Sequence, residues 1–115
     1  MNERDSIEVS TEQRGDALIV TPTGDIDLHR SPAFRARLKD FASSKPKRLV
    51  VDLSRVPYMD SSGVATLVEA MQIARRQSTE LVLCGLQDKV RSIFEIARLD
   101  MVFKIVPDAD TASKA

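Results

Sequence analysis

Short apolar segments alternate along this chain with longer segments in which apolar residues recur every three or four positions. Ile7 and Val9 stand two positions apart among polar residues, which is the period of a half-buried strand, so we predict a strand over residues 6–12. A second strand is predicted over residues 17–23, and a turn at Gly15 joins the two. The first part of the chain is therefore predicted to form a β-hairpin.

After the hairpin, the spacing becomes that of helices and buried strands. Ser31 is predicted to be an N-cap, with Pro32 at the first helical position. Phe34 and Leu38 then lie on one face, which predicts an amphipathic helix. Similar patterns predict five more elements: a strand over 49–53, a helix from the turn at Asp60 to about Gln77, a strand over 80–85, a helix over 88–100 and a strand over 102–106.

The order of these elements predicts the fold class. Strands that alternate with helices form β-α-β units, whose right-handed crossovers make the three later strands parallel to the second strand. We therefore predict a single α/β domain over residues 6–107, with a mixed sheet and with helices packed on the sheet. Residues 1–5 are predicted to be disordered, and residues 108–115, which lack apolar periodicity, are predicted to be frayed.

Charge and composition argue against several kinds of partner. The 17 Lys and Arg residues balance 17 Asp and Glu residues, so no net field attracts nucleic acid or an anionic membrane. No signal-peptide core is visible, and no apolar run approaches the roughly 20 residues that cross a bilayer. One cysteine, Cys84, and one histidine, His29, provide no ligand cluster for a metal. We expect a cytoplasmic protein that has no cofactor, binds no nucleic acid and does not insert into a membrane.

The turn before the second predicted helix has an unusual sequence, Asp60-Ser61-Ser62-Gly63. Asp60 is a good N-cap, since its carboxylate can accept hydrogen bonds from the backbone N–H of Ser62 or Gly63. Capping does not explain glycine in the first helical turn, where it costs about 0.5–1 kcal/mol relative to alanine. The missing side chain would let another group approach the backbone beside the two hydroxyls.

The stretch around this turn, "VDLSRVPYMDSSGVATLVEA", resembles the STAS domain of bacterial anti-sigma factor antagonists. Two further segments resemble the same family in the right order, "TPTGDIDLHRSPAFRARL" and "LVLCGLQDKVRSIFEIARLDMVFKIV". The resemblance extends over about residues 7–107, nearly the whole chain. The chain departs from the family pattern at Ala65, where many members have glycine, and in its short C-terminal tail, where some members add another helix.

The resemblance implies a regulatory role without enzymatic activity. It implies that an anti-sigma factor serine kinase binds the unphosphorylated protein, which frees the sigma factor, and that phosphorylation of Ser62 by the kinase ends the binding. A serine phosphatase would then restore the protein, which would act as a monomer or weak dimer. The partner-binding residues implied or expected around this turn are Asp25, Asp27, Tyr58, Asp60, Ser61 and Gly63. The topology suggests that the three aspartates gather at one end of the sheet.

Other functions are weighed against this one. A serine hydrolase would need the glycine pattern of a nucleophile elbow around Ser62 and a histidine base, and His29 is the one histidine available. A STAS subunit of a lipid-transporting ABC complex would share the fold without a phosphorylation cycle, but members of that group commonly carry threonine or lack the Ser-Ser pair. A subunit of a stress-signalling scaffold would also be regulated by phosphorylation. The "MDSSG" sequence favours the antagonist.

Overall fold

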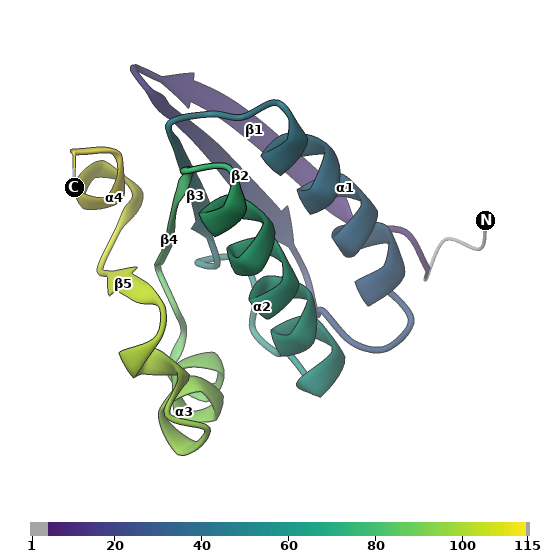
Figure 1. Cartoon of the computed structure of the whole chain (residues 1–115). Coiled ribbons are helices and arrows are strands. Elements are labelled where there is room, and N and C mark those ends of the chain that lie inside the picture. Colours follow the sequence, from purple (N-terminus) through teal and green to yellow (C-terminus); the bar gives the residue numbers. More distant parts are fainter. Residues whose placement is uncertain (1–4, 115) are drawn as a thin grey trace.

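Five strands form one sheet in the order β1-β2-β3-β4-β5 in the computed structural model, which describes residues 5–114 (Figure 1). β1 runs antiparallel to β2, and the remaining strands run parallel to β2. The predicted hairpin and mixed sheet are confirmed. The strands are β1 (Glu8–Arg14), β2 (Ala17–Thr23), β3 (Arg48–Asp52), β4 (Glu80–Cys84) and β5 (Lys104–Val106).

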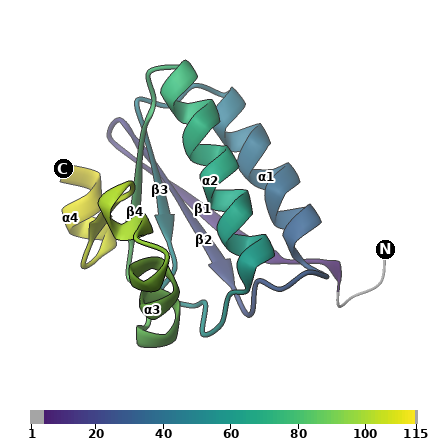
Figure 2. The ribbon, with the colours of Figure 1, turned by 60° about the horizontal axis from the view of Figure 1, so that its bottom comes forward.

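Two long helices, α1 (Ser31–Ser43) and α2 (Ser61–Arg76), lie side by side over one face of the sheet (Figures 1 and 2). The larger core fills the space beneath them, and its largest fully buried side chains include Phe34, Leu49 and Leu67. The shorter helix α3 (Asp88–Ile96) contributes Val90 and Phe94 to the same core. Because α1 follows β2, α2 follows β3 and these strands are parallel, both helices begin at the same end of the sheet.

The third helix is shorter than the sequence predicts. The expected helix over 88–100 ends at Ile96, and a separate 3₁₀ turn covers Leu99–Met101. Between them Arg98 has a φ of 58°, in the left-handed region, where a right-handed helix cannot continue. The spacing of apolar residues continues past this break, which is why periodicity alone does not detect it.

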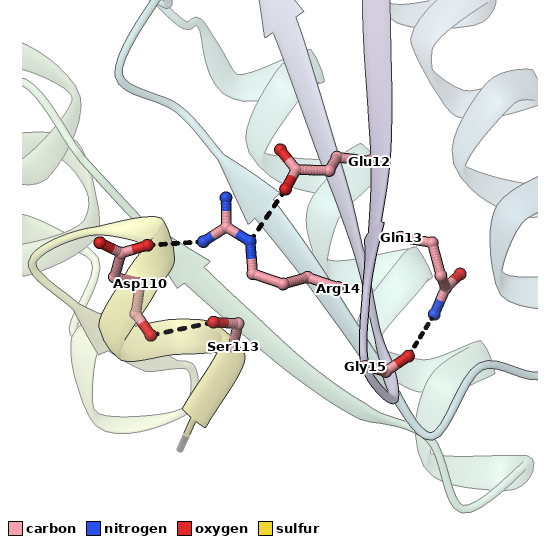
Figure 3. A network of polar contacts seen from close by, with 6 residues as sticks. All are labelled: Glu12, Gln13, Arg14, Gly15, Asp110 and Ser113. Atoms are coloured by element: carbon pink, nitrogen blue, oxygen red, sulfur yellow. Dashed lines mark hydrogen bonds and ion pairs between the residues drawn. The ribbon is translucent and has the colours of Figure 1, made fainter.

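The structure of the C-terminal tail differs from the prediction. Residues that were expected to be frayed form a short helix, α4 (Ala109–Lys114), on the face of the sheet opposite α1 and α2 (Figure 2). Ala112 is fully buried against this face, and Asp110 pairs with Arg14 of β1 at 2.6 Å (Figure 3). One buried alanine in a short helix leaves no periodic signal in the sequence. Most of the predicted disordered N-terminus, residues 1–4, lies outside the described residues.

Candidate functional site

The site lies where the loop after β2 meets the loop after β3. Ile26 and Met59 form an isolated parallel bridge beyond the ends of these strands. The N–H of Ile26 donates to the carbonyl of Tyr58 at 3.0 Å, and the carbonyl of Ile26 accepts from the N–H of Asp60 at 3.2 Å. These bonds join the segment that leads into α1 to the segment that leads into α2. They place the starts of the two helices together at the carboxyl end of the parallel strands.

Asp60 caps α2 and also holds the neighbouring loop. Its Oδ1 accepts from the backbone N–H of Ser62 at 2.9 Å and of Gly63 at 3.3 Å, as the sequence predicts. Its Oδ2 accepts from the N–H of Leu28 at 3.0 Å, so the same carboxylate ties the α1 loop to the α2 cap. Burial alone would raise the pKa of Asp60, but the hydroxyl of Ser62 and these N–H groups outweigh burial and hold the pKa below its usual value.

The hydroxyl of Ser62 lies between two partners. Its Oγ donates to Oδ1 of Asp60 at 2.5 Å and lies 2.7 Å from Oγ of Ser31. A hydroxyl has one proton, and that of Ser62 is used toward Asp60, so Ser31 must be the donor in the second contact. Within residues 5–114, no further group donates to the second lone pair of the Ser62 oxygen. The two contacts hold the hydroxyl in a fixed direction, and Ser62 as a residue is half-buried.

Ser31 is the site residue that sequence reasoning missed. We expected it to cap α1, but the helix begins at Ser31 itself and the cap position is Arg30. No side chain caps α1; the Oδ1 of Asp27 instead accepts from the N–H of His29 at 3.0 Å and of Arg30 at 3.1 Å in the turn before the helix. This leaves the Ser31 side chain, only 6% exposed, to face Ser62. No spacing in the sequence signals a contact between serines 31 positions apart.

Gly63 has a packing role. A Cβ at this position would lie 2.5 Å from Cγ of Met59 and 3.0 Å from the carbonyl oxygen of Ile26. The close approach that glycine suggested is therefore an approach by the protein's own loop. Gly63 is buried, and the structure does not place it on a surface that a partner could contact.

The other expected partner-binding residues lie on or beside the two loops that lead into α1 and α2. Asp25, Tyr58 and Ser61 are exposed, and Tyr58 retains 46% of its surface. Leu28, which the sequence did not single out, is 70% exposed in the same region. An exposed tyrosine and an exposed leucine therefore lie on the loops that lead into the two helices. The roles of these residues in binding a partner stay predictions.

A hollow of about 300 Å³ opens between α1 and α2 beside Ser62. We call it the α1–α2 hollow; its lining includes Leu28, Ser31, Arg35, Ser62, Ala65 and Glu69. Arg35 of α1 and Glu69 of α2 form a two-point ion pair in this lining, with Nε–Oε2 at 2.6 Å and Nη2–Oε1 at 2.9 Å. Ala65, where many family members have glycine, adds one methyl group to the lining of the hollow. The hydroxyl of Ser62 therefore lies beside a space that also contains a guanidinium.

The remaining candidate residues do not join this site. His29 is exposed and its Nδ1 lies 3.8 Å from Oδ1 of Asp5, while the partners of the Ser62 hydroxyl are Asp60 and Ser31. Cys84 is fully buried, and burial is the main reason that its pKa rises to about 12. Within residues 5–114, no group of three His, Cys, Asp or Glu side chains could hold a metal ion. No helix of that part of the chain is both long and apolar enough to cross a membrane.

Comparison with known proteins agrees with this geometry. The family model of the STAS domain matches residues 8–112. An anti-sigma-B factor antagonist from Listeria monocytogenes is 34% identical over 100 residues, which cover 87% of each chain. The chain therefore belongs to the STAS domain family, in the group of anti-sigma factor antagonists that its motifs predict.

Solved structures share the fold. The crystal structure of an anti-sigma factor antagonist from Mycobacterium paratuberculosis has a TM-score of 0.88 at 24% identity, covering 99% of this chain and 97% of that chain. The phosphorylated form of the Bacillus cell fate determinant SpoIIAA has a TM-score of 0.71 at 16% identity, covering 93% of this chain and 98% of that chain. At these identities the likeness concerns the fold alone.

Proposed function

We propose that this protein is an anti-sigma factor antagonist switched by phosphorylation of Ser62. In its unphosphorylated form it binds an anti-sigma factor serine kinase and frees the sigma factor. Once the kinase has transferred phosphate from ATP to Ser62, the complex dissociates, and a serine phosphatase resets the protein. The protein is the substrate in this cycle and not an enzyme, and it works in the cytoplasm without a cofactor, as a monomer or weak dimer.

The observation that supports this proposal most strongly is the geometry of the Ser62 hydroxyl. Asp60 accepts a hydrogen bond from this hydroxyl and Ser31 donates one to it, so the second lone pair has a fixed direction and no partner within residues 5–114. In the transfer, this lone pair attacks the γ-phosphorus of ATP and the bond to the β,γ-bridging oxygen breaks. The hydroxyl proton leaves toward a base, either Asp60 or a group of the kinase. A hydroxyl held in a fixed direction meets the positioning requirement of phosphoryl transfer.

The position of Ser62 also allows a switch that leaves the fold intact. A phosphate adds about 1.5 to 2 negative charges, and the N-terminus of a helix tolerates negative charge. The partner surface would be affected instead, because Leu28, Tyr58 and Ser61 are exposed around it. Like charge placed against an acidic partner surface costs several kcal/mol. About 3 kcal/mol already lowers the affinity more than a hundredfold.

The experiment is a pull-down from an extract of the source cells with three baits: wild type, Ser62→Asp and Ser92→Asp. Ser92 is exposed on α3, so its substitution adds the same charge far from Ser62 in the sequence and on another helix. We expect mass spectrometry to find one small ATP-binding kinase with wild type and Ser92→Asp, and to find it lost with Ser62→Asp. Equal recovery of a transporter ATPase and permease by all three baits would mean that the protein is a transporter subunit.

A further inference from the structure

Phosphorylation of Ser62 would force a change at Asp60. The oxygens Oγ of Ser62 and Oδ1 of Asp60 are 2.5 Å apart, joined by the proton that the phosphate would replace. Phosphorylation removes this hydrogen bond, and a phosphate beside the charged carboxylate would meet strong repulsion. The phosphate must therefore turn away from Asp60.

The α1–α2 hollow is the space beside Ser62 on the side of α1, and it contains a cation. Arg35 extends into its lining from α1, one helical turn after Ser31, whose Oγ is 2.7 Å from that of Ser62. The Arg35 guanidinium makes two contacts with the Glu69 carboxylate, one through Nε and one through Nη2. Ser31 supplies a hydroxyl donor in the same lining. The hollow thus offers a phosphate a planar, fork-shaped donor and a hydroxyl.

We propose that the phosphate on Ser62 lies in the α1–α2 hollow and takes Arg35 away from Glu69. This proposal rests on the phosphorylation of Ser62 proposed above. A phosphate dianion carries more charge than a carboxylate and binds the guanidinium through two parallel hydrogen bonds in the same way. The ion pair that links α1 to α2 is exchanged for one between Arg35 and the phosphate.

Glu69 is not left without a counter-charge by this exchange. The hydrogen bond from Arg35 is the main reason that the pKa of Glu69 lies below its usual value, and the charges of Lys39 and Arg76 lower it further. These two cations remain near Glu69 when Arg35 moves. The exchange therefore holds the phosphate against α1 and requires a phosphatase to displace Arg35 before it can act.

The test uses full-length protein with phosphoserine installed at position 62 during translation, so that no kinase is needed. The phosphorus-31 NMR signal is titrated to obtain the second pKa of the phosphate, in the parent and in Arg35→Gln, Glu69→Gln and Arg37→Gln. Arg37→Gln is the matched control, since Arg37 is exposed on the same helix and its guanidinium lies 5.4 Å from the centre of the Phe41 ring. The nearby ionisable groups Asp27, His29, Arg30 and Asp60 are present in every variant.

We expect Arg35→Gln to raise the second pKa of the phosphate by about half a unit or more, because a nearby cation stabilises the dianion. Glu69→Gln should lower this pKa, since it releases Arg35 and removes a like charge, and Arg37→Gln should leave it unchanged. Equal shifts for Arg35→Gln and Arg37→Gln, or no shift for either, would overturn the proposal. Because the phosphate is installed directly, that failure would leave the pull-down result standing, and a failed pull-down would leave this titration valid.

Discussion

The two ends of the sheet use charged residues in different ways. At the amino end, Asp110 of α4 keeps 81% of its side chain exposed and pairs with Arg14 (Figure 3). At the carboxyl end, Asp60 is half-buried and accepts hydrogen bonds from backbone N–H groups and from Ser62. An exposed ion pair competes with water and adds little stability, whereas a capping carboxylate satisfies donors that have no other partner. The comparison indicates that the candidate site also has a structural role, because Asp60 links the loop before α1 to the start of α2.

The largest expected effect on stability is that of replacing Asp60. Asp60→Ala removes the α2 cap and leaves the N–H of Leu28 and the hydroxyl of Ser62 without an acceptor. We expect urea unfolding at pH 7 to show a loss of about 3 kcal/mol, the sum of a cap and of unsatisfied donors. A loss no greater than that of an exposed Ser61→Ala control would contradict the structural role of Asp60.

The charge of Asp60 adds a pH dependence. Because its folded-state pKa is lowered, the stability that its charge contributes is present above the unfolded pKa and is lost as pH falls through the folded pKa. Asp60→Asn keeps a capping oxygen without the charge. We expect wild type to be more stable than Asp60→Asn at pH 7 and the difference to shrink below about pH 4. A difference that is constant between pH 7 and pH 3 would contradict the assignment.

Gly63→Ala should have the next largest effect. The new methyl group would meet Met59 and the carbonyl of Ile26, and such overpacking costs about 1–3 kcal/mol. Alanine regains up to about 1 kcal/mol of helix propensity, so we expect a net loss of about 1–2 kcal/mol in urea unfolding. A stability gain would mean that the Ile26 loop moves freely and that the two loops are not rigidly joined.

Ser31→Ala should have a smaller effect on stability. It removes one hydrogen bond to Ser62 in a nearly buried position, which we expect to cost about 1 kcal/mol. The same variant should be phosphorylated more slowly by the partner kinase, since the Ser62 hydroxyl loses one of the two contacts that direct it. Unchanged stability and rate would show that Ser31 does not orient the hydroxyl.

The smallest expected effect is at the opposite end of the sheet. Asp110→Asn breaks the ion pair with Arg14 but keeps the apolar contact of Ala112. We expect the urea midpoint to stay within error of wild type, since both charged groups are exposed. Ala112→Glu, which forces a charge against the sheet, should instead detach α4 and increase amide hydrogen exchange there. A marked loss of stability in Asp110→Asn would remove the contrast between the two ends.

The sequence predicts the features that rest on local patterns and misses those that rest on contacts between distant residues. The apolar runs at residues 49–53 and 80–85 predict the central parallel strands because strands covered on both faces need continuous apolar residues. The Asp60 cap was predicted because capping is local. The Ser31–Ser62 contact and α4 were not, because the first joins distant residues and the second depends on one buried alanine. Contacts of this kind leave no local pattern in the sequence, so they are recognised only in the folded structure.

The most direct measurement is site mapping of phosphorylation by the kinase that the pull-down recovers. Wild type, Ser62→Ala and Ser61→Ala are incubated with the kinase and ATP, and the phosphate count and its position are determined by mass spectrometry. Ser61 is the exposed neighbour and serves as the matched control. The account predicts one phosphate, on Ser62, in wild type and Ser61→Ala, and none in Ser62→Ala. Full phosphorylation of Ser62→Ala by a kinase that also binds it would contradict the account.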